Sequence, residues 1–284
     1  MKLAYMIATP ELKSMPMAWV GDYQRSIPRI AEIGYDGIEL QVRNPAEFDS
    51  AALGRCAQSA ALKISAVSTG GIGAEDGLFL MHADADVRRR AIERYKAVLE
   101  LAASYGVDAS IGRFRGVTRS APDRPTGEGW FRTALDELVP VAERLGIRIV
   151  LEPQMRFIGD LLNTIDETLQ FIDSYGSKAL MFEGDTFHQM MEEKSLVASI
   201  VAGQRSGRMT YYQVSDSNRL APGWGHHNWV DIIEVMRASG YDGWLSVECS
   251  QEPDSDAAAQ RAYATLRPLL PPPSGRGAGD ERAL

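Results

Sequence analysis

The chain has 284 residues, an apolar content of 45%, a charged content of 24% and a formal net charge of −8. This composition is ordinary for a globular protein, and the acidic balance argues against broad nucleic-acid binding. With only Cys56 and Cys249, a disulfide framework and a thiolate metal cluster are excluded. No apolar run is long enough to cross a bilayer, and the N-terminus does not read as a secretory signal. We therefore expect a cytoplasmic protein whose partner is a small molecule, with no membrane and no nucleic acid.

Apolar runs typical of strands alternate along the chain with amphipathic segments typical of helices. We predict eight strands, at residues 2–7, 37–42, 63–67, 107–111, 148–152, 179–183, 209–214 and 244–248. Helical periodicity is clearest at residues 87–105, 133–145, 165–175 and 230–238. Glycine punctuates many returns from helix to strand, where it ends helices at little steric cost. Eight such units favour an α/β fold, a single (β/α)8 barrel over residues 1–270, rather than an open doubly wound sheet.

Two segments fall outside this repeat. Residues 70–73, Gly-Gly-Ile-Gly, follow the third predicted strand but lack the spacing of a dinucleotide-binding or phosphate-binding loop. We predict a mobile loop over the barrel mouth there. Residues 271–284 are rich in proline and glycine and have no core-forming pattern, so we predict a disordered C-terminal tail.

Several predicted strands run into polar residues that can bind a metal. Glu152, Asp185 and Glu248 each stand at such a strand end. One carboxylate in this position is more often a helix cap or an ion-pair partner. In a closed parallel barrel, however, all carboxyl ends meet at one mouth, where barrel enzymes keep their chemistry. The joint pattern therefore predicts a metalloenzyme.

Five segments share their order and spacing with a known group of barrels. They are Gly-Tyr-Asp-Gly-Ile-Glu-Leu at 34–40, Leu-Glu-Pro at 151–153, Gly-Asp-Thr-Phe-His at 184–188, Val-Ser-Asp-Ser-Asn-Arg at 214–219 with Pro-Gly-Trp-Gly at 222–225, and Ser-Val-Glu at 246–248. In these segments the chain resembles the xylose-isomerase-like TIM barrels, over about residues 1–270. Within that superfamily it is most similar to the sugar and sugar-phosphate isomerases and epimerases, including ketose 3-epimerases and hydroxypyruvate isomerases.

The resemblance implies one divalent metal ion held by Glu152, Asp185, Gln213 and Glu248. The family has a histidine six positions before the arginine that matches Arg219, whereas this chain has Gln213. An amide oxygen is a neutral and usually weaker ligand, so Mn²⁺ or Mg²⁺ is favoured, with Zn²⁺ or Co²⁺ as alternatives. Complete loss of the metal is a further alternative.

The expected chemistry is removal of the weakly acidic proton beside a sugar carbonyl. A cation stabilises the negative charge that develops, and Glu152 and Glu248 are the candidate acid and base. Return of the proton to the opposite face gives an epimerase and return to the same face an aldose–ketose isomerase, and the sequence leaves both open. The predicted substrate contacts are His188, Arg219, Glu193, Trp224, Arg113 and Arg115. The last two could receive a phosphate or form surface ion pairs.

Two other function classes remain open. Gln213 is also consistent with a barrel that has lost turnover and only binds sugar. An apurinic-site endonuclease uses a related barrel, but its histidine-rich zinc cluster agrees poorly with four histidines and an acidic chain. The favoured partner is a sugar or sugar phosphate, and a homo-oligomer is an open alternative to a monomer.

Overall fold

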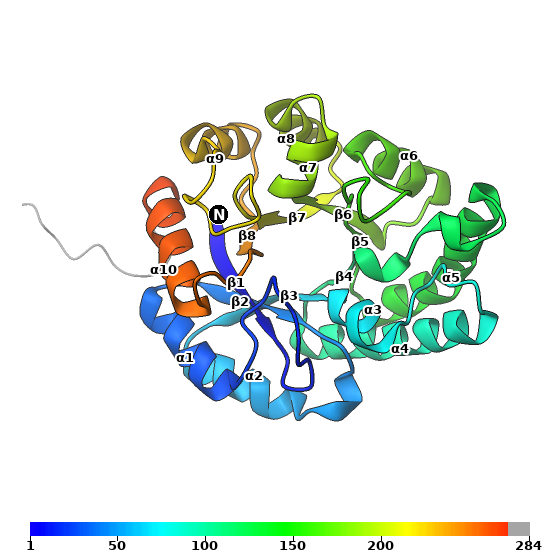
Figure 1. Ribbon diagram of the computed structural model, residues 1–284, viewed down its shortest axis with the longest axis horizontal. Helices are drawn as coiled ribbons and strands as arrows, with labels where there is room; N and C mark the ends of the chain where they lie inside the picture. The colour runs from blue at the N-terminus through cyan, green and yellow to red at the C-terminus, as the bar shows by residue number, and fades with distance from the viewer. Residues whose placement is uncertain (272–284) are drawn as a thin grey trace, which may run out of the picture.

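The computed structural model describes residues 1–271 and contains a closed barrel of eight parallel strands in the order β1 to β8, ringed by helices (Figure 1). The strands are β1 Lys2–Ala8, β2 Gly37–Gln41, β3 Lys63–Ser68, β4 Ala109–Ile111, β5 Ile149–Leu151, β6 Leu180–Asp185, β7 Met209–Val214 and β8 Trp244–Val247. Pairing of β1 with β8 closes the barrel. The eight predicted strands and the single (β/α)8 barrel are thus confirmed. The predicted tail, beyond Pro271, lies outside the described residues.

Helices follow the strands and ring the barrel, and α3 and α7 lie at its mouth (Figure 1). They are α1 Tyr23–Ile33, α2 Ser50–Ser59, α3 Gly70–Asp76, α4 Ala85–Tyr105, α5 Arg124–Leu145, α6 Ile165–Tyr175, α7 Thr186–Glu192, α8 Leu196–Arg205, α9 Trp229–Ala238 and α10 Ser255–Leu266. Four short 3₁₀ helices are η1 Pro45–Glu47, η2 Arg113–Arg115, η3 Thr118–Ser120 and η4 Arg267–Leu269. No helix within residues 1–271 combines the length and the apolar character needed to span a membrane.

The helix boundaries follow from local chemistry. The Asp22 side chain accepts a hydrogen bond from the backbone N–H of Gln24 and so caps the start of α1. Gly146 ends α5 with φ of 71°, a left-handed conformation that favours glycine. The prediction of a loop at residues 70–73 is wrong, because these residues begin α3. A Cβ on Gly71 would lie 2.9 Å from the side chain of Leu12, so the glycine serves close packing.

The barrel interior is unusually polar. Side chains alternate between the two faces of a strand, so residues two apart share the inner face. Pairs with this spacing are Glu39 and Gln41, Glu183 and Asp185, Tyr211 and Gln213, and Ser246 and Glu248. All eight residues are buried. The second residue of each pair lies nearer the carboxyl ends of the strands, so the polar inner face continues up to the mouth of the barrel.

Candidate active site and metal centre

A cavity of about 420 Å³ lies at the mouth formed by the carboxyl ends of the strands. Its lining combines polar residues from the strand ends with apolar residues from the loops above them. The polar members include Gln41, Ser68, Arg113, Glu152, Gln154, His188, Gln213, Arg219 and Glu248, and the apolar members include Met15, Met17, Met155, Ile158 and Phe187. The cavity can therefore enclose a small polar molecule under an apolar rim.

Glu152, Asp185 and His188 form the most compact group of metal-capable side chains at this mouth. One ligand atom from each lies within 4.8 Å of the other two, and all three residues are buried. His188 Nε2 is 3.3 Å from Glu152 Oε1, and Gln154 Nε2 donates to Glu152 Oε2 at 2.7 Å. Asp185 also caps α7 by accepting from the N–H groups of Phe187 and His188. This cap fixes the start of α7, and His188 in its first turn therefore places its imidazole beside Glu152.

Arg219 connects two of the predicted metal ligands. Its Nη1 donates to both oxygens of Asp185, at 2.9 and 2.7 Å, and its Nη2 donates to Glu248 Oε2 at 2.6 Å. The backbone of Arg219 is left-handed, with φ of 64°, and the guanidinium lies 5.1 Å from the centre of the Phe187 ring. This positively charged group therefore sits among the carboxylates at the place where the sequence predicts a substrate contact.

The two carboxylates respond differently to this environment. Burial alone would raise the pKa of Asp185, but Arg219 and His188 outweigh it and hold that pKa below its ordinary value. Burial raises the pKa of Glu248 well above its ordinary value, with Arg219 opposing and Glu152 reinforcing the shift. Glu248 is thus the weaker acid of the two and Asp185 the stronger, although both pair with Arg219.

Gln213 places its amide between the cavity and the barrel interior. Its Nε2 donates to Glu39 Oε1 at 2.8 Å, whereas its Oε1 is buried without a hydrogen-bond partner. Sequence reasoning did not assign Glu39 a role in the site. The sequence nevertheless pointed to Glu39, because this residue belongs to the segment Gly-Tyr-Asp-Gly-Ile-Glu-Leu, on which the family resemblance partly rests.

The remaining predicted substrate contacts separate into two groups. Arg113 lines the cavity, whereas Arg115, Glu193 and Trp224 are not among the lining residues. Arg115 is fully buried and donates to the backbone carbonyls of Gly112, Glu152, Leu161 and Leu162. Glu193 accepts from the N–H of Ile165 at 2.7 Å at the start of α6, and Trp224 is 36% exposed on the β7–α9 loop. The two arginines diverge because they are two residues apart in the short helix η2.

The donor set is compatible with a hard divalent cation. Carboxylate and amide oxygens are the ligands that Mg²⁺ and Mn²⁺ prefer. Glu152, Asp185 and Glu248 supply the carboxylates, and the unpartnered Oε1 of Gln213 supplies a neutral oxygen at the cavity wall. His188 offers a nitrogen beside Glu152, with its Nδ1 also buried and unpartnered. An orphaned buried oxygen among carboxylates is what a cation would satisfy.

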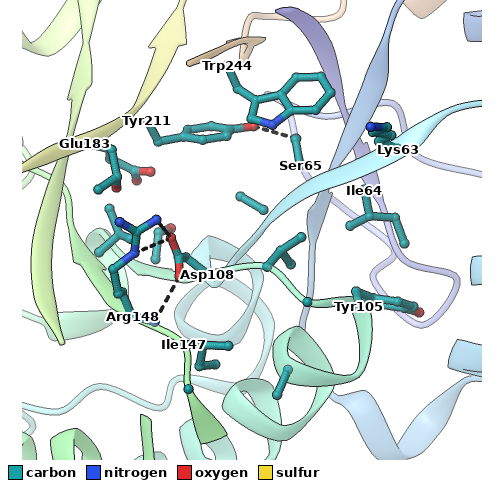
Figure 2. Close-up of a pocket in the computed structure, with 18 of the residues that line it drawn as sticks. Lys63, Ile64, Ser65, Tyr105, Asp108, Ile147, Arg148, Glu183, Tyr211 and Trp244 are labelled. Carbon is teal, nitrogen blue, oxygen red and sulfur yellow. Dashed lines mark hydrogen bonds and ion pairs between the residues drawn. The ribbon is translucent and has the colours of Figure 1, made fainter. Parts of the chain in front are cut away.

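A second cavity, of about 810 Å³, opens at the opposite end of the barrel, where the strands begin. Figure 2 shows Glu183 and Tyr211 facing its interior, with Trp244 near its edge. The Tyr211 and Ser65 hydroxyls are 2.6 Å apart, and Arg148 pairs with Asp108 at 2.6 Å. Glu183 Oε1 is buried there without a hydrogen-bond partner, but all the predicted ligands lie at the other end. The mouth cavity is therefore the candidate site.

These features define a (β/α)8 barrel with an acidic, metal-capable mouth. A family model described as the xylose isomerase-like TIM barrel matches residues 27–269, and the chain belongs to that family. It is 28% identical over 229 residues to L-ribulose 3-epimerase of Mesorhizobium japonicum (80% of this chain, 75% of the relative), and 26% identical over 249 residues to D-psicose 3-epimerase of Enterocloster bolteae (81% and 77%). The crystal structure of 3-keto-D-glucoside 4-epimerase from Escherichia coli superposes with a TM-score of 0.80 at 19% identity, covering 94% of this chain and 99% of that one, and shows likeness of fold.

Proposed function

We propose that this chain is a divalent-metal-dependent sugar epimerase or isomerase that abstracts the proton beside a carbonyl, with a ketose or its phosphate as substrate. The observation that carries the proposal is that Glu152 and Glu248, which follow β5 and β8, line one cavity together with Gln213 and His188. The relatives named above, which are sugar epimerases, support the same reaction class.

A bound divalent cation would be held by Glu152, Asp185, Gln213 and Glu248 and would stabilise the negative charge that develops on the substrate oxygens. His188 and Gln154 each hold one oxygen of Glu152 and so fix the orientation of that carboxylate. Arg219 fixes Glu248 through one of its oxygens. Two carboxylates held in this way can remove a proton on one side of a sugar and return one from the other.

The roles of the two glutamates follow from their surroundings. Burial raises the pKa of Glu248 against the opposing charge of Arg219, so this carboxylate takes up a proton more readily than an exposed one and is suited to proton transfer. Glu152, whose orientation is fixed by Gln154 and by His188 at 3.3 Å, is the candidate for the second proton transfer. Glu152 follows β5 and Glu248 follows β8, so one can remove the proton from one side of the substrate and the other can return a proton to the opposite side. This inverts the carbon beside the carbonyl, and we therefore favour epimerisation over aldose–ketose isomerisation.

The other residues that line the cavity would orient the substrate. Arg113 places a positive charge at the rim, where a phosphate or carboxylate of the substrate can pair with it. Phe187, Ile158 and the methionines give an apolar wall that excludes water from the reacting carbon.

The test is proton exchange with solvent. Purified protein supplied with Mn²⁺ and a panel of free and phosphorylated ketoses in D₂O should incorporate deuterium beside the carbonyl, as followed by NMR. Glu152→Gln and Glu248→Gln should each slow incorporation by about 10²–10⁴-fold, the usual contribution of a well-placed acid or base. Glu193→Gln is the matched control, because Glu193 lies off the cavity. Absence of deuterium from every sugar with any metal would contradict the proposal.

A sugar-binding barrel without turnover is the second candidate, and Arg219 is the observation that favours it. Its guanidinium already neutralises Asp185 and Glu248, and Gln213 brings no charge to the site. Such a protein would bind sugar with substoichiometric metal and exchange no protons. Under the favoured proposal, Gln213→His instead strengthens metal binding, which a Mn²⁺ titration measures.

A further inference from the structure

Glu39 makes a contact across the inside of the barrel. It lies on β2, which pairs with β1 and β3, whereas Gln213 lies on β7. The hydrogen bond from Gln213 Nε2 to Glu39 Oε1, at 2.8 Å, therefore crosses the lumen rather than a strand ladder. Glu39 is fully buried, so the bond is shielded from water.

Glu39 is itself held by a chain of hydroxyl groups. Ser68 donates to Glu39 Oε1, and Ser110 donates to the Ser68 hydroxyl at 3.1 Å. These hydroxyl groups come from β3 and β4, and the Ser68 hydroxyl shares Glu39 Oε1 with the Gln213 amide from β7. The acceptor that faces Gln213 is therefore fixed before any ligand enters the mouth.

A side-chain amide has two different ends, and only its oxygen can hold a cation. The Oε1 of Glu39 is an acceptor, because it accepts from both Ser68 and Gln213 Nε2, so it selects the NH₂ end of the Gln213 amide. The oxygen end must then point away from Glu39, and Gln213 Oε1 is indeed the end without a partner, on a residue that lines the mouth cavity.

We propose that Glu39 is a positioning residue that fixes the Gln213 amide with its oxygen toward the cavity and thereby sets the affinity of the site for a divalent cation. This inference rests on the proposed function only in taking the cavity as a metal site. It extends that function to a residue outside the ligand set, in the way that outer carboxylates orient the ligands of other metal centres.

The competing explanation is that any buried negative charge below the site attracts a cation. Glu183 separates the two explanations, because it is also a buried glutamate of the barrel interior and makes no hydrogen bond to Gln213. Glu39→Met and Glu183→Met each remove one buried carboxylate at similar side-chain length. Only the first removes the acceptor for the amide.

The first measurement uses metal-free protein. The side-chain amide signals of Gln213, assigned in ¹H–¹⁵N NMR spectra by their loss in Gln213→Ala, should move and lose protection from solvent exchange in Glu39→Met. They should stay in place in Glu183→Met. Unchanged Gln213 signals in Glu39→Met would overturn the positioning role without reference to metal or activity.

The second measurement titrates Mn²⁺ and follows the free ion by electron paramagnetic resonance. Glu39→Met should weaken binding by about 10–100-fold, the usual cost of losing an outer-shell partner, and Glu183→Met by clearly less. Glu39→Gln, which keeps an acceptor oxygen, should fall between Glu39→Met and the unmodified chain. Equal losses in Glu39→Met and Glu183→Met would show a charge effect and overturn the proposal.

A double variant completes the test. In a Gln213→Ala background, Glu39→Met should weaken Mn²⁺ binding no further than Glu183→Met does, because the amide that it positions is gone. If Mn²⁺ binds and depends on Glu39 as described, yet no sugar exchanges protons, the proposed reaction fails and the positioning role stands. If the unmodified chain binds no Mn²⁺, both fail.

Discussion

At the residue scale, Asp216 shows how a buried carboxylate can organise a loop. It accepts from the backbone N–H groups of Ser217, Gly223 and His227 and from the indole N–H of Trp229, at 2.7 to 3.0 Å. Burial alone would raise the pKa of Asp216, but these donors outweigh it and lower the pKa. We expect Asp216→Asn to reduce the free energy of unfolding by about 2–4 kcal/mol at pH 7, because several charge-assisted bonds are lost.

The same lowered pKa gives the sign of the pH dependence. The Asp216 carboxylate contributes its full stability above the ordinary aspartate pKa of about 3.9 and loses it as the pH falls through the lower folded pKa. The stability difference between the unmodified chain and Asp216→Asn should therefore be largest near neutral pH and shrink below about pH 4. Urea unfolding from pH 7 to pH 3 measures this, and a difference that stays constant with pH would contradict it.

Gly112 is a second residue whose identity the site requires. A Cβ at this position would overlap Glu152 Oε2 and lie 2.9 Å from Gln154 Nε2. We expect Gly112→Ala to displace Glu152 and weaken Mn²⁺ binding and proton exchange by at least about tenfold, given the cost of a misplaced catalytic group. Gly129→Ala is the control, because a Cβ there meets no atom within 4 Å. Equal metal affinity in the two variants would show that Glu152 tolerates the added methyl group.

At the element scale, the 3₁₀ helix η2 uses its two arginines differently. Arg115 is buried and joins η2 to the end of β5 and the following loop through carbonyls of Gly112, Glu152 and Leu161, and burial lowers its pKa to about 10. Arg115→Met leaves these carbonyls without donors, so we expect a loss of about 3–5 kcal/mol in unfolding free energy. Arg113→Met, in the same helix but exposed, should cost little. Urea unfolding distinguishes them, and similar losses in both variants would contradict this role.

At the scale of the whole molecule, the proposed ligands follow or belong to four successive strands, β5 to β8. A cation held by them links these strands only in the folded state. At a Mn²⁺ concentration of 100 times the dissociation constant, the unfolding free energy should rise by about 2.7 kcal/mol. Thermal unfolding with Mn²⁺ and then with EDTA checks this, and Asp185→Asn should abolish the shift. A thermal-unfolding midpoint that is the same at every Mn²⁺ concentration would contradict metal binding at the mouth.

Much of the fold followed from local patterns. The periodicity of the apolar residues predicted the eight strands and helices such as α6, and glycines marked the ends of helices. The alternation of these elements predicted the closed barrel. These features depend on neighbours a few positions apart, which a sequence displays directly. The helix at Gly70–Asp76 was missed because its glycines suggest a loop, whereas the close approach of Gly71 to Leu12, in a distant segment, is visible only in the folded structure.

The sequence by itself determined that Glu152, Asp185, Gln213 and Glu248 stand at strand ends, and parallel closure then brings strand ends to one mouth. Only the tertiary structure decided which side chains touch there. Glu39 reaches Gln213 across the lumen, Arg219 joins Asp185 to Glu248, and Arg115 turns away from the cavity. Such contacts depend on barrel closure, loop paths and side-chain rotamers, which involve residues as far as 174 positions apart and leave no periodic signal in the chain.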